Sequence, residues 1–389
     1  MIKFKSLFIP MVVAAMTPMF TACNDDDFAE TIFPDVPTVA DPSSKTYQFD
    51  TWLNRNFGDV YNLDFKYKMA DVEADKNYNL VPADYQKAVD LALLVKYTWF
   101  DAYKAVCGEL LLKQNGPRML HLIGSSAHNA TEGTEVLGLA EGGIKITLFK
   151  VNSMNLNDSY RMNEYYFRTM HHELTHILHQ KKSYPTRFNE LSNGNYDASN
   201  WGSRNAGLCT SLGFITNYAS SEYREDFAET VANYVTRTPE DYDLLLWCAD
   251  RGWYSGDDEL DQTSAYCYYY YASTSAKEND KRTYTLQYVS LGDGHVSLMD
   301  NTGRVYNKIE DIENYLTRLN LQLGEDMVFE VEDQDKVDGR AIILDKLKIA
   351  RDWLLEQWNV DLDKLREEVQ KRQNNFDITA LRSQITDIE

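Results

Sequence analysis

The sequence lacks the positive charge and the long apolar segments that mark nucleic-acid-binding and integral membrane proteins. Only 39 of its 389 residues are lysine or arginine, whereas 60 are aspartate or glutamate, so the formal net charge is −21. Because a nucleic-acid-binding surface concentrates basic residues, this balance argues against nucleic acid as a partner. Beyond the N-terminal leader, no run approaches the roughly 20 apolar residues of a membrane-spanning helix. We therefore expect the rest of the chain to be soluble.

Motifs built on cysteine, glycine or repetition are also missing. Cys107, Cys209, Cys248 and Cys267 show no Cys-x-x-Cys spacing, which argues against a cysteine-ligated zinc site. Nothing in their spacing pairs them, and a chain of this length does not depend on disulfides for stability, so we expect buried free thiols. The sequence contains no phosphate-binding glycine loop and no internal repeat.

The first 22 residues are predicted to be a secretory signal that is not part of the fold. Lys3 and Lys5 form a basic start, residues 7–16 supply an apolar core, and small residues precede Cys23. This pattern resembles a bacterial lipoprotein signal, which implies cleavage before Cys23 and lipidation of that cysteine. The alternative, a single membrane-spanning anchor, is disfavoured because the apolar run is too short.

Residues 23–45 are predicted to be a flexible tether, because a polar, proline-containing segment can bury little apolar surface. Its acidic run, Asn24–Asp27, is similar to the surface-export signal of Bacteroidetes lipoproteins; an ordinary solvated charge run is the alternative. Residues 46–389 are long enough for one large domain or two ordinary ones, and we expect one domain. Together these features predict a protein that is lipid-anchored to the outer membrane and exposed at the cell surface.

The main chemical signal lies in the stretch Met170–His179, which contains His172-Glu-Leu-Thr-His176. On a helix, residues i and i+4 lie on one face, so the two imidazoles can bind one metal ion. In the His-Glu-x-x-His pattern the histidines bind zinc and the glutamate, here Glu173, acts as the general base. The alternative is a polar helix face that happens to carry histidines, but only seven histidines occur in the whole chain.

A catalytic zinc needs a third protein ligand, and the metzincin arrangement does not supply one here. Metzincins continue the motif with glycine and histidine at positions that in this chain are His179 and Lys182. His179 and the neighbouring His171 lie one turn beyond the metal-binding face or off it. We expect both to be on the surface or in a layer behind the ligands.

A better candidate lies in residues 218–229, Tyr-Ala-Ser-Ser-Glu-Tyr-Arg-Glu-Asp-Phe-Ala-Glu. Ser220 or Ser221 can cap a helix on which Glu225 and Glu229 share one face. A glutamate from a second helix completes a His₂Glu site, and the other carboxylate can hold the outer nitrogen of a histidine ligand. The alternative is a solvated acidic face, but the apolar residues interleaved in this segment require part of the helix to be buried.

The combination of His172-Glu-x-x-His176 with Glu225-x-Phe-Ala-Glu229 resembles the gluzincin arrangement of anthrax lethal factor and its relatives. This resemblance implies that Glu225 binds zinc and that Tyr218 stabilises the transition state. More closely, the chain resembles the zinc metallopeptidase lipoproteins of Bacteroidetes that are associated with substrate import through outer-membrane transporters. That resemblance implies a possible complex with such a transporter.

The expected fold is α+β, a zincin-like (gluzincin) metallopeptidase domain with C-terminal helices. Residues 255–339 do not share the resemblance, and they are predicted to be an inserted α+β unit. Strands are expected at 63–67, 119–124 and 144–151, and helices at 50–57, 82–112, 158–180, 220–237, 309–323, 346–359 and 363–373.

These observations predict a zinc-dependent peptidase that holds one Zn²⁺ per chain. Glu173 would take a proton from the metal-activated water and deliver it to the leaving amine, while Tyr218 would donate a hydrogen bond to the developing oxyanion. The expected substrate is a peptide or glycopeptide, which could pair with an edge strand formed by residues 144–151.

Two other functions are compatible with the same residues. One is a non-catalytic, zinc-containing surface lipoprotein that binds glycan or peptide for a transporter. The other is zinc-dependent hydrolysis of a non-peptide amide. The presence of both Glu173 and Tyr218 favours catalysis over binding, whereas no residue pattern separates peptides from other amides.

Overall fold

The computed structural model describes most of the chain between residues 40 and 386. The described residues are 40–69, 80–128, 135–136, 138–141, 144–250, 254–255, 265–271, 282–289, 296–300, 302–323, 327–328 and 337–386. The predicted signal, Cys23 and most of the predicted tether lie outside these residues. Within these residues, no helix is both long enough and apolar enough to cross a membrane.

A four-stranded sheet has the strand order β1–β2–β6–β5. The strands are β1 (Asp64–Lys66), β2 (Met119–Leu122), β6 (Lys145–Leu148) and β5 (Gly138–Glu141). β1, β2 and β6 are parallel to their neighbours, whereas β5 runs antiparallel to β6. The side chains at the centre of β2 and β6 are buried in the main hydrophobic core, which fixes the register of these strands.

The prediction that residues 144–151 form an edge strand is wrong. The strand exists, but β6 pairs with β2 on one side and with β5 on the other, so both rows of its backbone groups are used. β5 is the outer strand of this sheet. The short, glycine-containing sequence of β5 gives little alternation of apolar and polar residues, and this is why the sequence pattern did not reveal it.

The long helix predicted near the N-terminus is confirmed, although it ends at Gly108 and not at residue 112. Asp84 caps its start by accepting hydrogen bonds from two backbone N–H groups, and Gly108 ends it with a φ of +79°. The helix consists of α3 (Tyr85–Leu94), a π-helical segment η3 (Val95–Phe100) and α4 (Asp101–Cys107).

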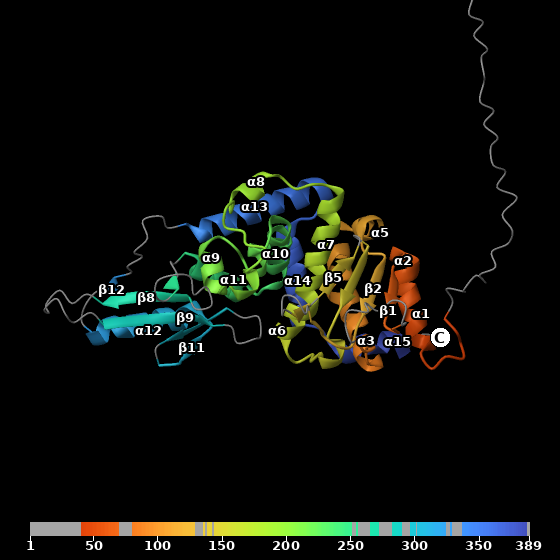
Figure 1. Ribbon diagram of the computed structural model, residues 1–389. Helices are drawn as coiled ribbons and strands as arrows, with labels where there is room; N and C mark the ends of the chain where they lie inside the picture. The colour runs from red at the N-terminus through yellow and green to blue at the C-terminus, as the bar shows by residue number, and fades with distance from the viewer. Residues whose placement is uncertain are drawn as a thin grey trace, which may run out of the picture. The chain divides into compact units, whose positions relative to one another are not determined.

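Two packed helices carry the residues predicted to bind metal. The first is a continuous helical segment composed of α6 (Ser159–Met162), π-helical η5 (Asn163–Phe167) and α7 (Arg168–Lys181). Asp158 caps it by accepting a hydrogen bond of 3.0 Å from the backbone N–H of Arg161. The second helix, α10, packs against α7, and α7 also contacts β5 and β6 (Figure 1).

The predicted cap of α10 (Tyr223–Thr236) by Ser220 or Ser221 is wrong. Glu222 occupies the N-cap position, and its side chain makes no capping hydrogen bond. The serines come before it, at the end of a separate 3-10 turn, η7, where the Ser220 hydroxyl donates to the carbonyl oxygen of Asn217 at 2.7 Å. This local hydrogen bond uses the hydroxyl that the sequence pattern assigned to the helix.

The C-terminal helices pack against the metal-binding region. α13 and α14 correspond to the two predicted closing helices, and both contact α10. α13 begins earlier than predicted because Asp338 caps it, accepting a hydrogen bond of 2.8 Å from the backbone N–H of Ala341. The bounds are α13 (Gly339–Trp358), α14 (Leu362–Asn374) and α15 (Ile378–Thr386).

The described strands of the predicted insertion form an antiparallel sheet of order β11–β10–β9–β8–β12, with β7 paired to β8. These strands are β7 (Tyr254–Ser255), β8 (Ala265–Tyr271), β9 (Arg282–Val289), β10 (Ser297–Asp300), β11 (Val305–Tyr306) and β12 (Met327–Val328). Helix α12 (Ile309–Leu323) matches its predicted range. Helices together with small sheets confirm the α+β class, whereas the bounds of the insertion stay a prediction.

The remaining short elements lie between these. They are α1 (Tyr47–Leu53), η2 (Asn54–Gly58), α2 (Asp59–Tyr61), α5 (Leu110–Asn115), β3 (Ala127–His128), β4 (Glu135–Val136), η4 (Val151–Ser153), α8 (Arg187–Glu190), η6 (Trp201–Ser203), α9 (Ala206–Ser211), η7 (Tyr218–Ser220) and α11 (Pro239–Ala249). Cys209 and Cys248 are buried free thiols, as predicted, and Cys107 is a half-buried free thiol. The side chain of Cys267 lies outside the described part.

A buried ion pair joins α13 to α10. Lys346 Nζ lies 2.6 Å from Asp226 Oδ2, and both side chains are almost fully buried. The ammonium group also donates to the carbonyl oxygen of Gly213 at 2.8 Å, and the Tyr196 hydroxyl donates to the Asp226 carboxylate at 2.8 Å. Since burial alone opposes charge on both partners, either one would be costly to leave unpaired.

Replacing Lys346 by methionine should therefore destabilise the protein strongly. Methionine keeps the shape and the apolar stem but leaves Asp226 buried without its cation, a loss that typically costs about 3–5 kcal/mol. The matched control is Lys348→Met on the same helix, where the ion pair with Asp352 is exposed and its loss should change little. Urea unfolding of both variants measures the difference. Equal unfolding midpoints would show that the buried pair does not hold α13 in place.

Candidate metal centre

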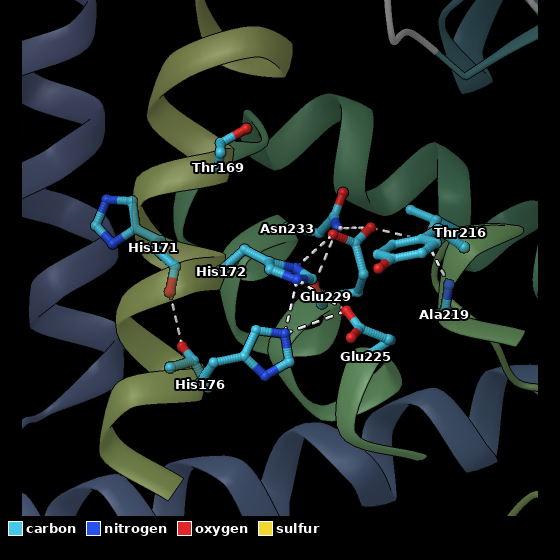
Figure 2. A network of polar contacts seen from close by, with 12 residues as sticks. Thr169, His171, His172, His176, Thr216, Ala219, Glu225, Glu229 and Asn233 are labelled. Atoms are coloured by element: carbon cyan, nitrogen blue, oxygen red, sulfur yellow. Dashed lines mark hydrogen bonds and ion pairs between the residues drawn. The ribbon is translucent and has the colours of Figure 1, made fainter. Parts of the chain in front are cut away.

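Three atoms from two helices converge at one point, as Figure 2 shows. His172 Nε2 and His176 Nε2 lie 2.9 Å apart, and Glu225 Oε2 lies 3.0 Å from the first and 3.1 Å from the second. Zinc bonds of about 2.0–2.2 Å hold tetrahedral ligand atoms about 3.3 Å apart. The triangle therefore has the size and the donor set of a zinc site.

The two helices bring these atoms together in a simple way. His172 and His176 lie one turn apart on α7, so that both imidazoles leave the same face of that helix. Glu225 lies in the first turn of α10 and reaches across to both of them. In contrast to this group, His171 points away on the other side of α7 (Figure 2).

The second ring nitrogen of His172, Nδ1, is held by Glu229, which lies one turn beyond Glu225 on α10. His172 Nδ1 is 2.9 Å from Glu229 Oε1, and the second carboxylate oxygen accepts hydrogen bonds from Thr216 Oγ1 at 2.8 Å and Asn233 Nδ2 at 3.2 Å. Burial would raise the pKa of Glu229, but the charge of Arg168 and these hydrogen bonds lower it to about 2. Glu229 is thus ionised and only accepts, so His172 Nδ1 donates to it.

The outer nitrogen of His176 is held by another histidine. His179 Nε2 lies 2.8 Å from His176 Nδ1, and burial with the neighbouring His176 lowers the pKa of His179 to about 4. His179 is therefore neutral near pH 7, and its Nε2 can accept a hydrogen bond from His176 Nδ1. This agrees with the expectation that His179 lies behind the ligands.

The expectation for His171 is wrong, because this side chain lies neither on the surface nor behind the ligands. It is 1% exposed and its ring stacks on Tyr103, whose hydroxyl is 3.2 Å from Nδ1. Burial lowers the pKa of His171 to about 3, so the ring is neutral. Adjacent residues on a helix point in different directions, and here the neighbouring direction faces the apolar core.

These hydrogen bonds determine which atoms face the candidate site. With Nδ1 of His172 and of His176 acting as donors, Nε2 is the ring nitrogen that would present a lone pair to a metal ion, and Glu225 adds a carboxylate oxygen. Without a cation the three acceptors would repel one another. Burial opposes charge on His172, yet Glu225 and Glu229 raise its pKa to about 10, which shows how strongly the site favours a positive charge. The residues fit a bound metal cation.

The two predicted catalytic residues lie beside the three ligands. Glu173 follows His172 on α7 and is buried, and this burial raises the pKa of its carboxyl group. The Tyr218 ring stacks on the ring of His172 with centroids 5.9 Å apart. Burial, the charge of Glu225 and a hydrogen bond to that carboxylate raise the pKa of Tyr218, so its hydroxyl stays protonated and can donate.

Several residues around the site had no signal in the sequence. Thr216 Oγ1 accepts from the backbone N–H of Ala219 at 3.0 Å, which directs its proton to Glu229. Trp201 packs edge-on against Tyr218 with ring centroids 4.8 Å apart. Both come from the segment between α7 and α10, whose sequence has no periodic pattern. For Asn233, the spacing of four residues from Glu229 is a signal that could have been followed.

Most of the chain matches a known protein family, described as "Putative zinc-binding metallo-peptidase", over residues 42–363. The chain belongs to this family. A solved structure described as that of "a putative zinc-binding metallo-peptidase from Bacteroides caccae ATCC 43185" is similar, with 31% sequence identity and a TM-score of 0.57. The similarity covers 88% of this chain and 97% of that chain. The comparison with curated proteins gave no match.

The description of the family names a metal ion, whereas the geometry of the site alone does not distinguish between several ions. Two imidazole nitrogens and a carboxylate could bind several divalent ions, whereas the family is described as zinc-binding. Zinc is accordingly the ion that the family description favours; His172, His176 and Glu225 would hold it and would leave one coordination position open for water or substrate.

Replacing the two glutamates should have different effects on zinc binding. Glu225→Ala removes a ligand and should abolish stoichiometric binding, whereas Glu229→Ala removes the partner of His172 and should weaken binding roughly 10- to 100-fold. Glu222→Ala, at the N-cap of the same helix, is the matched control. Metal analysis and competition with a chelator measure these effects. The reverse order of the two losses would make Glu229 the ligand.

The histidines supply the second check on the same site. We expect one zinc ion per wild-type chain and none in His172→Ala or His176→Ala, because each change leaves only two protein ligands. Metal content of the purified variants, with circular dichroism to confirm that they are folded, tests this. Full occupancy in both variants would place the metal elsewhere.

Proposed function

We propose that this protein is a zinc-dependent peptidase that hydrolyses peptide bonds with a metal-activated water. The observation that carries the proposal is the convergence of His172 Nε2, His176 Nε2 and Glu225 Oε2 within 3.1 Å of one another, with Glu173 and Tyr218 beside them. Three ligands, a base and an oxyanion donor are the parts that metal-assisted hydrolysis of an amide requires.

Zinc bound at such a site polarises a carbonyl group and lowers the pKa of a bound water to about 7. Glu173 follows a ligand directly in the sequence, and we assign it the role of taking the proton from the attacking water. Its buried carboxyl, with a raised pKa, holds that proton more readily than an exposed glutamate would. It then delivers the proton to the amine that leaves.

Tyr218 is assigned to the oxygen of the substrate carbonyl. Its hydroxyl stays protonated because burial and the charge of Glu225 raise its pKa, and its ring stacks on that of His172, one of the proposed ligands. A hydrogen bond that strengthens as negative charge develops on this oxygen lowers the barrier and contributes little to ground-state binding.

We further propose that an extended peptide adds to β5. As the outer strand of the four-stranded sheet, β5 has one side that β6 does not use, and it contacts the metal-binding helix α7. Backbone hydrogen bonds to such an edge bind a peptide with little regard to its sequence. This assignment replaces β6, which pairs with strands on both sides. A peptide or glycopeptide is the proposed substrate.

The proposed location is the cell surface, with lipid on Cys23 as the only membrane attachment. Support comes from the lipoprotein-like signal at residues 1–22, from the polar tether at 23–45 and from a family match that begins at residue 42. The similar solved structure comes from Bacteroides caccae. A link to an outer-membrane nutrient import system is part of the proposal and rests on the sequence resemblance.

The decisive experiment separates a peptidase from a binding module. A peptide-library digest identifies a cleaved substrate, and Glu173→Gln should then nearly abolish turnover while zinc and fold are retained. Tyr218→Phe should reduce kcat a hundred- to a thousandfold, which corresponds to about 2.7–4 kcal/mol, with a much smaller change in KM. Tyr223→Phe, an exposed tyrosine on α10, is the control.

The alternative, a non-catalytic zinc-containing lipoprotein, makes a different forecast for the same variants. A wild-type protein that cleaves no peptide in the library, but binds a glycan or peptide that Tyr218→Phe also binds, would replace the peptidase by that alternative. Equal turnover of Tyr218→Phe and wild type would remove Tyr218 from the mechanism and leave the zinc site in place.

A further inference from the structure

Buried polar side chains spaced four residues apart continue from the metal centre along α10 and past its end. They are Glu229, Asn233, Arg237 and Asp241, and each is at most 8% exposed. Asn233 Nδ2 lies 3.2 Å from Glu229 Oε2, Arg237 Nε lies 2.9 Å from Asn233 Oδ1, and the Arg237 guanidinium pairs with the Asp241 carboxylate. Through Glu229 this ladder reaches His172.

The direction of the hydrogen bonds that Asn233 makes is fixed from both sides, by Arg237 and by Glu229. A guanidinium group only donates, so the Asn233 atom that faces it must be the carbonyl oxygen. The amide nitrogen of Asn233 is thereby turned toward Glu229, where it donates to Oε2 and also to the backbone carbonyl of Glu229 at 2.9 Å. Arg237 and the two acceptors of Glu229 thus select the same one of the two orientations that the amide can take.

This orientation decides what Glu229 can do. With the nitrogen of Asn233 toward it, Glu229 Oε2 has two donors, Asn233 and Thr216, and its other oxygen remains for His172 Nδ1. In the flipped amide, an oxygen would face the carboxylate and push it away from this position. The carboxylate in turn fixes the His172 tautomer, in which Nε2 carries the lone pair directed at the metal.

The far end of the ladder is anchored outside the metal-binding helices. Asp241 lies in the first turn of α11 and accepts a hydrogen bond of 3.1 Å from the backbone N–H of Val296, just before β10 in the predicted insertion. The carbonyl oxygen of Arg237 accepts from Gln370 Nε2 at 3.1 Å and from Arg366 at 3.3 Å, both on α14. Contacts with three helices, α10, α11 and α14, therefore hold Arg237 in place.

We propose that Asn233 and Arg237 are positioning residues of the metal centre, which orient Glu229 and through it the ligand His172. Neither touches the metal or the substrate. The proposal rests on the assignment of His172, Glu225 and His176 as ligands. If it is correct, contacts from α10, α11, α14 and the predicted insertion all help to hold the metal centre in place.

The test measures zinc affinity in the full-length protein by competition with a chelator. Asn233→Leu keeps the approximate shape but removes the donor to Glu229, so zinc affinity should fall roughly 10- to 100-fold, as for other losses behind a ligand. Arg237→Met removes one of the restraints on the Asn233 amide, whose hydrogen bonds to Glu229 remain, and should cause a smaller loss in the same direction. Arg237→Lys keeps a donor and a charge and should restore most of the affinity.

Thr236→Val is the matched control, because Thr236 is equally buried on α10 and its hydroxyl bonds only to the Ala232 carbonyl in the described contacts. The zinc affinity of the Thr236→Val variant should equal that of the wild type. The absorption spectrum of the cobalt-substituted protein adds a readout of ligand geometry that a general loss of stability does not change. It should differ from wild type in Asn233→Leu and match it in Thr236→Val.

Wild-type zinc affinity and an unchanged cobalt spectrum in both Asn233→Leu and Arg237→Met would overturn the proposal. If Asn233→Leu does not fold, the zinc affinities of Arg237→Met and Arg237→Lys are compared instead. Equal zinc affinities of these two variants would count against the proposal. A wild-type chain without zinc would refute the ligand assignment and the ladder together. A chain that binds zinc and cleaves no peptide would refute only the peptidase, since affinity still tests the ladder.

Discussion

The hydrogen bond between His172 Nδ1 and Glu229 Oε1 is the contact on which the metal centre depends. It joins α7 to α10 in the interior, and it is a charge-assisted bond of the kind that is shorter and stronger than a neutral one. It also determines that His172 presents a lone pair to the metal position. Glu225 is placed by the same packing of the two helices, one turn before Glu229, so a single helix pair supplies all three proposed ligands.

The cost of this arrangement is three carboxylates close together, of which Glu173 and Glu229 are buried and Glu225 is half-buried. Glu173, Glu225 and Glu229 influence one another's ionisation, and an unpaired buried charge is strongly destabilising. Without metal, a proton on His172 and the charge of Arg168 offset part of this negative charge. A bound divalent cation offsets it more completely, and because it binds the folded state alone, it stabilises that state by mass action. Metal binding and the stability of this region are therefore linked.

Much of the fold and of the site could be read from the sequence because the signals are local and periodic. The helix that carries His172 and His176 and the α12 helix follow from the spacing of their residues. What failed depended on partners distant in sequence. Strand order is one example, since β5 has no clear pattern of its own and becomes the outer strand only by pairing with β6. The side of the helix on which His171 lies is another, because it depends on where Tyr103 packs.

The ladder from Glu229 to Asp241 could be predicted from the sequence only in part. Its four-residue spacing is visible, yet α10 ends at Thr236 and Pro239 begins another helix, so the pattern alone predicts no contact beyond Arg237. The contact forms because Arg237 reaches Asp241 in the next helix, and Asp241 in turn meets the backbone of Val296. A segment that reads as an accessory insertion thus contributes a donor to the hydrogen-bond network of the metal ligands. A continuous series of polar contacts therefore leads from that segment to His172.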